Sequence, residues 1–286
     1  MEWRQVNLKY KKIVEVPRPF IKWVGGKRQL IPQLSQYFPD KFNTYIEPFV
    51  GGGAIFFYLL PQKSVLMDIN PELINTYQVI KHKVEELIES LRQHKNNKDY
   101  FYEIRSWDRN PSRFRTLDKV ERASRAIFLN KTCYNGLFRV NKKNQFNTPF
   151  GRYKNPTICD ELNLRAVSIA LTDAKIQLGD FSESINNAKS GDFVYMDCPY
   201  HPVSDTANFT SYTMDDFGIG EQKRLHRVYS ELDKKGCTVL LSNSYTPFIL
   251  DLYKDYVINI VHANRAVNCD PSKRGKVREV LISNKK

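Results

Sequence analysis

The run of residues 44–83 most constrains the fold of this chain, because it alternates the signals of strands and helices. A short strand is expected at 44–49, followed by three consecutive glycines and an apolar helix start at 54–60. A buried strand is expected at 64–68, and Pro71 opens a helix that extends to about residue 83. Strand, glycine turn, helix and strand in this order outline a parallel βαβ unit. The run therefore predicts an α/β fold.

Strand signals return toward the end of the chain, after a region of different character. That region has charged helices expected at 85–94 and 118–130 and then an Asn- and Gly-rich stretch. We therefore expect an α/β core built from residues 1–80 and 165–286, interrupted by an inserted domain at 81–164. The later strand segments, rich in apolar residues, are 175–181, 192–200, 237–244 and 257–265.

The chain is strongly basic, with 44 Lys and Arg against 31 Asp and Glu and a formal net charge of +13. Residues 130–159 contain six basic residues, no acid, and several Tyr and Phe between them. Basic side chains neutralise phosphates and aromatic rings stack on bases, so nucleic acid is the leading partner. The alternative is a basic protein with an ordinary solvated surface. The six basic residues are Lys131, Arg139, Lys142, Lys143, Arg152 and Lys154.

Several classes of protein are excluded by what the chain lacks. Its longest apolar block, residues 54–60, is far shorter than the roughly 18 residues of a membrane span, and the N-terminal residues contain no apolar core of a secretory signal. The five Cys are odd in number and form no Cys-x-x-Cys pair. This excludes a disulfide scaffold and a zinc ribbon and favours a reducing cytoplasm. The five His form no pair with ligand spacing, so no metal is expected.

The glycines at 51–53 form the first candidate site. They let the backbone pass close to a ligand at the carboxyl end of the preceding strand. Asp68 ends the next strand, where the hydroxyl pair of a ribose would find an acceptor. The run matches neither the G-x-G-x-x-G dinucleotide pattern nor the G-x-x-x-x-G-K-[ST] phosphate loop, and a simple tight turn is the alternative.

The second candidate site is Asp197-Cys198-Pro199-Tyr200, at the end of a buried strand. Its carboxylate and a neighbouring carbonyl can accept hydrogen bonds from an amino group, while the Tyr ring stacks on a flat ring. The alternative is a strand-ending turn, for which these residues are ordinary. A third segment, FIKWVGGKR at 20–28, by itself predicts only a turn with solvated lysines.

Several short segments occur in a fixed order along the chain: FIKWVGGKRQL, IEPFVGGGAIFF, MDIN, YNGLFRVNKKNQFNTPFGRYKNP, GDF, DCPY and FTSYT. Their order and spacing resemble the Dam-like DNA adenine-N6 methyltransferases. That family includes solitary Dam enzymes and the adenine methylases of restriction–modification systems that read GATC. The resemblance extends from about residue 20 to residue 282.

The resemblance implies a Rossmann-like α/β core that binds S-adenosylmethionine. By this analogy Trp23 packs on the cofactor, Lys27 meets its carboxylate and Asp68 takes the ribose hydroxyls. Asp180 and Phe181 would lie beside the cofactor adenine. The matched cofactor-binding positions are Trp23, Lys27, Glu47, Phe49, Gly51, Asp68, Asp180, Phe181 and Asp197.

The resemblance also implies that Asp197, Cys198, Pro199 and Tyr200 are the catalytic residues, because they match the D-P-P-Y box around a flipped target adenine. Asp197 and the carbonyl of residue 198 would accept hydrogen bonds from N6 and direct its lone pair toward the sulfonium methyl. Cys198 stands where the family has its first Pro; it can supply the carbonyl, with a loss of rigidity. A cytosine-C5 methyltransferase would use such a Cys as nucleophile, but those enzymes carry Cys after Pro, whereas here Cys precedes Pro.

The stretch 134–154 matches the DNA-recognition hairpin of the family. Arg139 matches the position that meets a guanine, where Arg suits the O6 and N7 acceptors. Lys131 and Arg152 are expected on phosphates. Tyr134 and Asn135 match residues that border the space left by a flipped base. The expected DNA-binding residues are Lys131, Tyr134, Asn135, Leu137, Arg139, Asn147, Pro149, Arg152 and Tyr153.

The chain is therefore expected to be a site-specific adenine methyltransferase acting on double-stranded DNA, within 5′-GATC-3′. Its partners would be DNA and S-adenosylmethionine, with no membrane. A cognate restriction endonuclease could act on the same site without direct binding. Two alternatives stay open: a DNA-binding relative that has lost catalysis, marked by Cys198, and a methyltransferase acting on another adenine site or on cytosine N4.

Overall fold

The computed structural model describes residues 15–203, 217–264 and 276–285. These residues form two compact units, each described by itself. The helical unit comprises residues 15–25, 51–60 and 70–176, and the sheet unit comprises the other described residues. The FTSYT segment at 209–213 lies outside the described residues.

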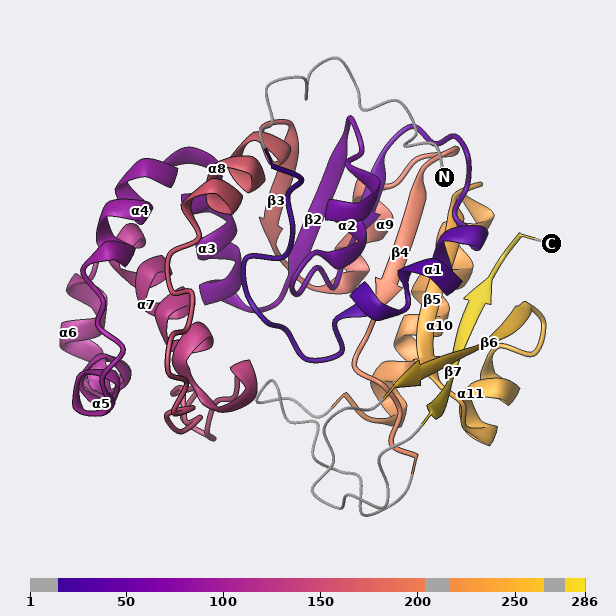
Figure 1. Cartoon of the computed structure of the whole chain (residues 1–286). Helices are drawn as coiled ribbons and strands as arrows, with labels where there is room; N and C mark the ends of the chain where they lie inside the picture. Colours follow the sequence, from indigo (N-terminus) through magenta and orange to yellow (C-terminus); the bar gives the residue numbers. More distant parts are fainter. Residues whose placement is uncertain (1–14, 204–216, 265–275, 286) are drawn as a thin grey trace. The chain divides into compact units, whose positions relative to one another are not determined.

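The strands form one seven-stranded sheet in the order β3-β2-β1-β4-β5-β7-β6 (Figure 1). β1 pairs in parallel with β2 and β4, and β4 pairs in parallel with β5. β7 runs antiparallel between β5 and β6. This confirms the predicted α/β sheet. The strands are β1 (Tyr45–Glu47), β2 (Ser64–Asp68), β3 (Ala174–Leu178), β4 (Phe193–Asp197), β5 (Thr238–Ser244), β6 (Val257–Asn264) and β7 (Lys276–Ser283).

The central strand β4 is covered on both faces, because its side chains alternate between them. Val194 and Met196 share a buried cluster with Leu225 of α10 (Ile219–Lys234). On the other face, Phe193 and Tyr195 contact the ring of Phe38. With both faces filled, the carboxyl ends of the parallel strands are where side chains reach a ligand.

Most helices begin where the sequence carries a start signal. Asn70 caps α3 by accepting hydrogen bonds from the N–H groups of Glu72 and Leu73, and Pro71 is the first helical residue. The helical unit contains α2 (Ala54–Leu59), α3 (Pro71–His82), α4 (Val84–Arg92), α5 (Lys98–Ser106), η4 (Trp107–Arg109), α6 (Pro111–Thr116), α7 (Lys119–Thr132), η5 (Tyr134–Gly136) and α8 (Glu161–Ala170). The sheet unit contains η2 (Lys27–Gln29), α1 (Ile31–Leu34), η3 (Ser35–Tyr37), η6 (Phe181–Glu183), α9 (Ser184–Asn187), α10 and α11 (Pro247–Leu252).

The two compact units differ from the two predicted segments, because residues 15–25, 51–60, 70–80 and 165–176 were expected in the α/β core and lie in the helical unit. For residues 70–80 the physical reason is that α3 packs along α7. Glu72 of α3 pairs with Arg122 of α7, and Asn75 Nδ2 donates to Lys119 O at 2.9 Å. The assignment of 81–164 as a recognition domain remains a prediction. Over the described ranges, no helix has the length and apolar character to span a membrane.

Candidate functional site

Three acidic residues lie at the carboxyl ends of parallel strands in the sheet unit. Glu47 ends β1, Asp68 ends β2 and Asp197 ends β4. Because β1 pairs in parallel with both other strands, these ends meet at one edge of the sheet. Ligands of open α/β sheets bind outside this edge. The fold thus brings to one edge the acids that the sequence singled out.

Lys27 forms an ion pair with Asp197 at this edge. Its Nζ lies 2.6 Å from Asp197 Oδ1 and 4.9 Å from the centroid of the Tyr200 ring, and its side chain is only 5% exposed. Burial raises the pKa of Asp197, and the Lys27 ammonium opposes that shift. The ammonium therefore favours the ionised carboxylate, which acts only as a hydrogen-bond acceptor. The resemblance predicts that Lys27 meets a cofactor carboxylate; in this structure it contacts a catalytic-site candidate.

Tyr200 is anchored from β7. Its hydroxyl donates to Glu279 Oε2 at 2.8 Å, and Glu279 lies opposite Ser244 of β5 in the antiparallel register. Burial raises the pKa of Tyr200, so the phenol keeps its proton and remains the donor. The hydrogen bond fixes the ring beside the Lys27–Asp197 pair.

The Cys198 thiol is buried behind the edge rather than presented at it. Its Sγ accepts a hydrogen bond from Asn243 Nδ2 at 3.4 Å and lies 3.7 Å from Ser242 O. Burial raises the pKa of this thiol. Since the thiolate is the reactive form of cysteine, this environment disfavours a nucleophilic role and leaves the backbone carbonyl as the group that Cys198 can offer.

Asp180 and Phe181, which follow β3, are held by Arg224 of α10. The two Nη atoms of Arg224 each lie 2.7 Å from one carboxylate oxygen of Asp180, and its guanidinium carbon lies 4.1 Å from the Phe181 ring centroid. Hydrogen bonding to Arg224 lowers the pKa of Asp180 to about 2. The Phe181 ring stacks on Phe49, with centroids 5.4 Å apart. Stacked rings beside an ionised carboxylate suit a flat heterocycle with amino donors.

In the helical unit, the glycine turn lies directly against Trp23. A Cβ on Gly51 would lie 2.6 Å from Trp23 Cδ1, and the φ of +46° is unfavourable for any side chain. Tyr77 Oη donates to Gly51 O at 3.0 Å, and the Trp23 ring stacks on Phe138 at 5.2 Å. Two residues predicted to bind the cofactor, Trp23 and Gly51, are therefore in contact.

The hairpin segment, residues 134–154, has the antiparallel course that the family resemblance implies. Isolated bridges join Cys133 to Phe150 and Val140 to Phe146. Arg139 is exposed, and its Nε donates to Asn147 Oδ1 at 2.7 Å. Two predicted DNA-binding side chains thus meet across the hairpin.

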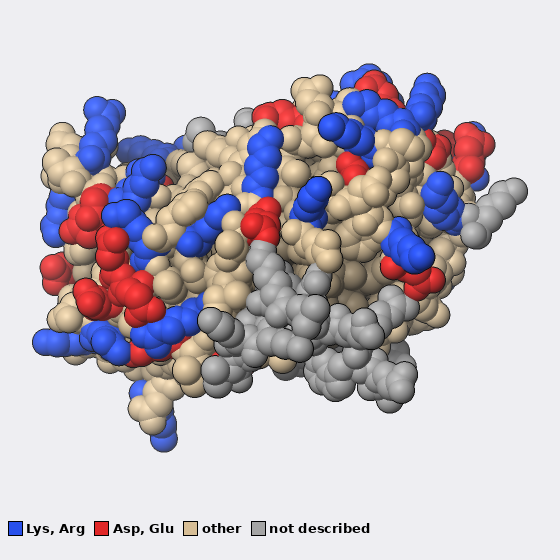
Figure 2. Space-filling model, turned by 90° about the horizontal axis from the view of Figure 1, so that it is seen from above, with Lys and Arg blue, Asp and Glu red and all other residues tan. Residues whose placement is uncertain are grey.

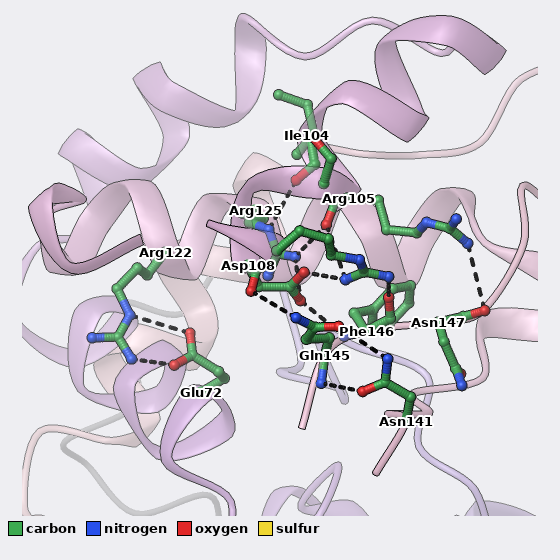
Figure 3. A network of polar contacts seen from close by, with 12 residues as sticks. Glu72, Ile104, Arg105, Asp108, Arg122, Arg125, Asn141, Gln145, Phe146 and Asn147 are labelled. Atoms are coloured by element: carbon green, nitrogen blue, oxygen red, sulfur yellow. Dashed lines mark hydrogen bonds and ion pairs between the residues drawn. The ribbon is translucent and has the colours of Figure 1, made fainter. Parts of the chain in front are cut away.

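Charged side chains from outside the hairpin bond to its backbone at Phe146 (Figure 3). Asp108 accepts a hydrogen bond from the Phe146 N–H at 2.8 Å and lies 2.8 Å from Arg125 Nη2. Arg109 pairs with Asp108 and donates to Phe146 O at 2.5 Å. The side chains of Asp108 and Arg125 are only 10% and 6% exposed. The hairpin is therefore anchored by charges that have little contact with water.

The other predicted DNA-binding residues differ in exposure. Lys131 is partly buried, and burial lowers its pKa. The Tyr153 ring lies 4.9 Å from Lys22 Nζ, in a cation–π contact. The exposed residues are Tyr134, Asn135, Pro149 and Arg152, and the partly buried ones are Lys131, Leu137 and Tyr153.

The sequence analysis did not identify several side chains that position the candidate site residues. Asp108 and Arg125 lie in charged stretches, where sequence alone does not separate buried charges from solvated ones. Arg224 and Glu279 lie far along the chain from the groups that they hold. No local pattern marks any of the four, because each acts through a partner that only the fold brings near.

Opposite charges are mixed on the face shown in Figure 2, where Lys and Arg side chains lie among Asp and Glu side chains. The structure contains surface ion pairs of this kind, such as Arg165 Nε to Glu85 Oε1 at 2.7 Å and Arg92 Nη2 to Glu161 Oε1 at 2.6 Å. The net charge of +13 is therefore not gathered into a single basic field on that face.

The chain is similar to known proteins over nearly its whole length. The family model of D12 class N6 adenine-specific DNA methyltransferases matches residues 23–267. The type II methyltransferase M1.LlaDCHI of Lactococcus lactis subsp. cremoris is 46% identical over 283 residues, which cover 98% of this chain and 99% of that protein. The type II methyltransferase M.MjaIII of Methanocaldococcus jannaschii is 44% identical, over 93% of this chain and 99% of its own.

A third relative is named a DNA adenine methylase rather than a type II methyltransferase. The DNA adenine methylase of Haemophilus influenzae is 35% identical over 270 residues, which cover 92% of each chain. The family match, the near-complete coverage of these relatives and the acidic carboxyl edge of the sheet agree with one another. The chain belongs to the D12 class of N6 adenine-specific DNA methyltransferases.

Proposed function

We propose that this enzyme transfers a methyl group from S-adenosylmethionine to N6 of adenine within 5′-GATC-3′ of double-stranded DNA. The observation that carries the proposal is the Lys27–Asp197 ion pair beside Tyr200 at the end of β4. An ionised carboxylate there accepts N–H bonds from an exocyclic amino group, and the Tyr200 ring offers a flat surface to the base.

The carboxylates and aromatic rings at the sheet edge fit S-adenosylmethionine. Asp68 would take the ribose hydroxyls, and Asp180 would accept from the adenine amino group beside the stacked Phe49 and Phe181 rings. Bound there, S-adenosylmethionine supplies a methyl group carried on a sulfonium. The other proposed cofactor contacts are Glu47 and Lys27 in the sheet unit and Trp23 and Gly51 in the helical unit.

Asp197 prepares the target nitrogen. Once the adenine is turned out of the duplex, N6 donates to the Asp197 carboxylate and to the Cys198 carbonyl. These bonds take the nitrogen lone pair out of conjugation with the ring and direct it toward the methyl donor. The contribution of the protein is positioning and electrostatics, with no covalent intermediate. Lys27 keeps the carboxylate in its acceptor form.

The hairpin segment is the proposed reader of the DNA sequence. Arg139 would donate to O6 and N7 of a guanine, and the bond from its Nε to Asn147 sets the plane of the guanidinium while leaving its Nη groups for the base. Lys131 and Arg152 would contact phosphates. The remaining proposed contacts with bases or with the space left by base flipping are Tyr134, Asn135, Leu137, Pro149 and Tyr153.

The proposed substrate and the names of the relatives support a proposal for the biological setting. We place the enzyme in the cytoplasm, with DNA as its macromolecular partner. Two of the relatives are named as type II methyltransferases, which favours a restriction–modification role. In that role an endonuclease would act on the same site without binding this chain.

The test is to identify the modified nucleoside. The protein is incubated with a GATC duplex, or with duplexes altered at one base, and with S-adenosylmethionine carrying a labelled methyl group. Mass spectrometry of the digested DNA should show labelled N6-methyladenine from the GATC duplex and much less from the altered duplexes. Equal labelling of all duplexes would overturn the GATC assignment, and N4-methylcytosine would overturn the adenine assignment.

A further inference from the structure

Two buried amide side chains lie behind the active-site loop, residues 197–201. Gln222 comes from α10 and Asn243 from β5, and both are 0% exposed. Asn243 Nδ2 donates to Gln222 Oε1 at 3.0 Å, which joins the two amides into one bridge. Neither residue is adjacent to the loop in the sequence.

The amide bridge contacts three positions of the loop. Gln222 Nε2 donates to Pro199 O at 2.9 Å. Asn243 Oδ1 accepts from the His201 N–H at 3.1 Å, and Asn243 Nδ2 donates to Cys198 Sγ at 3.4 Å. The loop is therefore held on both sides of the Cys198–Pro199 peptide, which carries the carbonyl proposed to accept from N6.

The loop is fixed again at its far end. Ser244 Oγ donates to His201 O at 2.6 Å, and Thr246 Oγ1 lies 3.3 Å from His201 Nδ1. Both backbone groups of His201 are thus bonded to side chains of β5, and its ring contacts Thr246 just beyond that strand. An uncharged network of this kind fixes a backbone without placing a buried charge beside the reacting groups.

We propose that Gln222 and Asn243 are positioning residues for methyl transfer, and that their amide bridge supplies the rigidity which a proline would supply at position 198. The proposal rests on the assignment of Asp197–Tyr200 as the site of methyl transfer. It explains how Cys198 is accommodated there: the thiol is itself a partner of the bridge, so the loop stays fixed without the ring of a proline.

The first experiment separates positioning from folding. Gln222→Met keeps the size of the side chain and removes both side-chain bonds of Gln222. Asn243→Ser is a second variant, which removes the bonds of Asn243 to Gln222, Cys198 and His201. The matched control is Asn163→Ala, since Asn163 is 2% exposed and bonds both backbone groups of Arg18 at 2.9 and 3.1 Å, in the helical unit. Single-turnover methylation, binding of S-adenosylmethionine, binding of the GATC duplex and the Tm are measured for each.

Both bridge variants should lower the single-turnover rate about 10- to 100-fold, the scale of a small misplacement of reacting groups. Their affinities for cofactor and DNA should stay close to those of wild type. Asn163→Ala should lower the Tm by a similar amount and leave the single-turnover rate unchanged. If the bridge variants that fold lose no more rate than this control, the amides are structural only and the proposal is wrong.

The second experiment tests the rigidity that the bridge supplies. Cys198→Pro is added to Gln222→Met, with Cys198→Ala as its control. The Pro should recover part of the lost rate, and the Ala should recover none. If Cys198→Pro leaves the double variant as slow as Gln222→Met alone, the proposal fails. Asp197→Ala is measured alongside, because a wild-type rate in that variant would overturn the active-site assignment itself, whatever the amide variants do.

Discussion

The loop at 197–201, which is the proposed active site, and the hairpin segment are both bonded to buried side chains, but by different chemistry. The loop at 197–201 is bonded to the uncharged amides Gln222 and Asn243. The hairpin at 134–154 is bonded to a buried carboxylate, Asp108, which is paired with Arg125. The loop places its proposed reacting groups among buried side chains, whereas the hairpin holds Arg139 out in solvent.

This difference determines what each region loses when a partner is removed. A buried amide group left without its hydrogen bond costs about 1–3 kcal/mol. A buried charge left without its counter-charge costs about 3–5 kcal/mol. The hairpin is therefore the region whose anchor affects stability most, and the loop is the region where a small displacement affects the rate most.

The largest expected effect on stability is that of Asp108→Ala. It leaves the Arg125 guanidinium buried without its carboxylate, so the free energy of unfolding should fall by about 3–5 kcal/mol. Urea denaturation followed by circular dichroism measures this. Glu85→Ala, which breaks an exposed ion pair with Arg165, is the control and should leave the midpoint unchanged. If the two variants have the same urea midpoint, the buried Asp108–Arg125 pair contributes no more to stability than an exposed ion pair, and the prediction is wrong.

The largest expected effect on rate is that of Asp197→Ala. Removal of a preorganised electrostatic partner costs on the order of 10²- to 10³-fold in kcat, and DNA binding should survive because the hairpin is unchanged. Asp197→Asn, which keeps the shape of the side chain, should also be impaired. Single-turnover methylation and a DNA-binding assay measure the two properties. Turnover near that of wild type would mean that the loop is not the active site.

Arg139→Ala should change selectivity rather than the rate on all sites alike. A bidentate Arg–guanine contact contributes roughly 1–3 kcal/mol of discrimination against a wrong base. The variant should therefore relax selectivity at one G·C pair of GATC and lower kcat/KM on the cognate site. Methylation of GATC and of single-base variants, at several salt concentrations, measures this.

Lys131→Ala is the comparison variant for Arg139→Ala. A phosphate contact contributes equally to all sequences, so this variant should weaken binding uniformly and flatten the salt dependence. If Arg139→Ala loses the same factor on every duplex, Arg139 is another phosphate contact. The base-reading role would then belong to other residues of the hairpin.

The smallest expected effect is that of changing Cys198 in the otherwise wild-type chain. The thiol is buried and its pKa is raised, so Cys198→Ala should remain active and Cys198→Pro should keep or raise activity. Methylation of a GATC duplex measures both. Complete inactivation by Cys198→Ala, or a covalent adduct with DNA, would make the thiol a participant in the reaction.

The sequence by itself determined the elements whose signals are local. The strand expected at 64–68 is β2, with the same bounds, and the helix expected from Pro71 is α3. The strand expected at 44–49 is shorter, because only Tyr45–Glu47 pair with β2 and only Tyr45 and Ile46 pair with β4. Periodicity, glycine turns and caps act within a few residues of one another, so the sequence expresses them directly.

The tertiary structure alone decided which distant residues work together. Strand β7 was not expected from the sequence; it is defined by antiparallel pairing with β5 and β6 on its two sides. The same holds for Asn243 and Gln222 behind Pro199, and for Asp108 and Arg125 behind Phe146. A polar residue has the same local pattern whether it is solvated or buried. Its role depends on the partner that folding brings within hydrogen-bond distance, and that partner lies elsewhere in the chain.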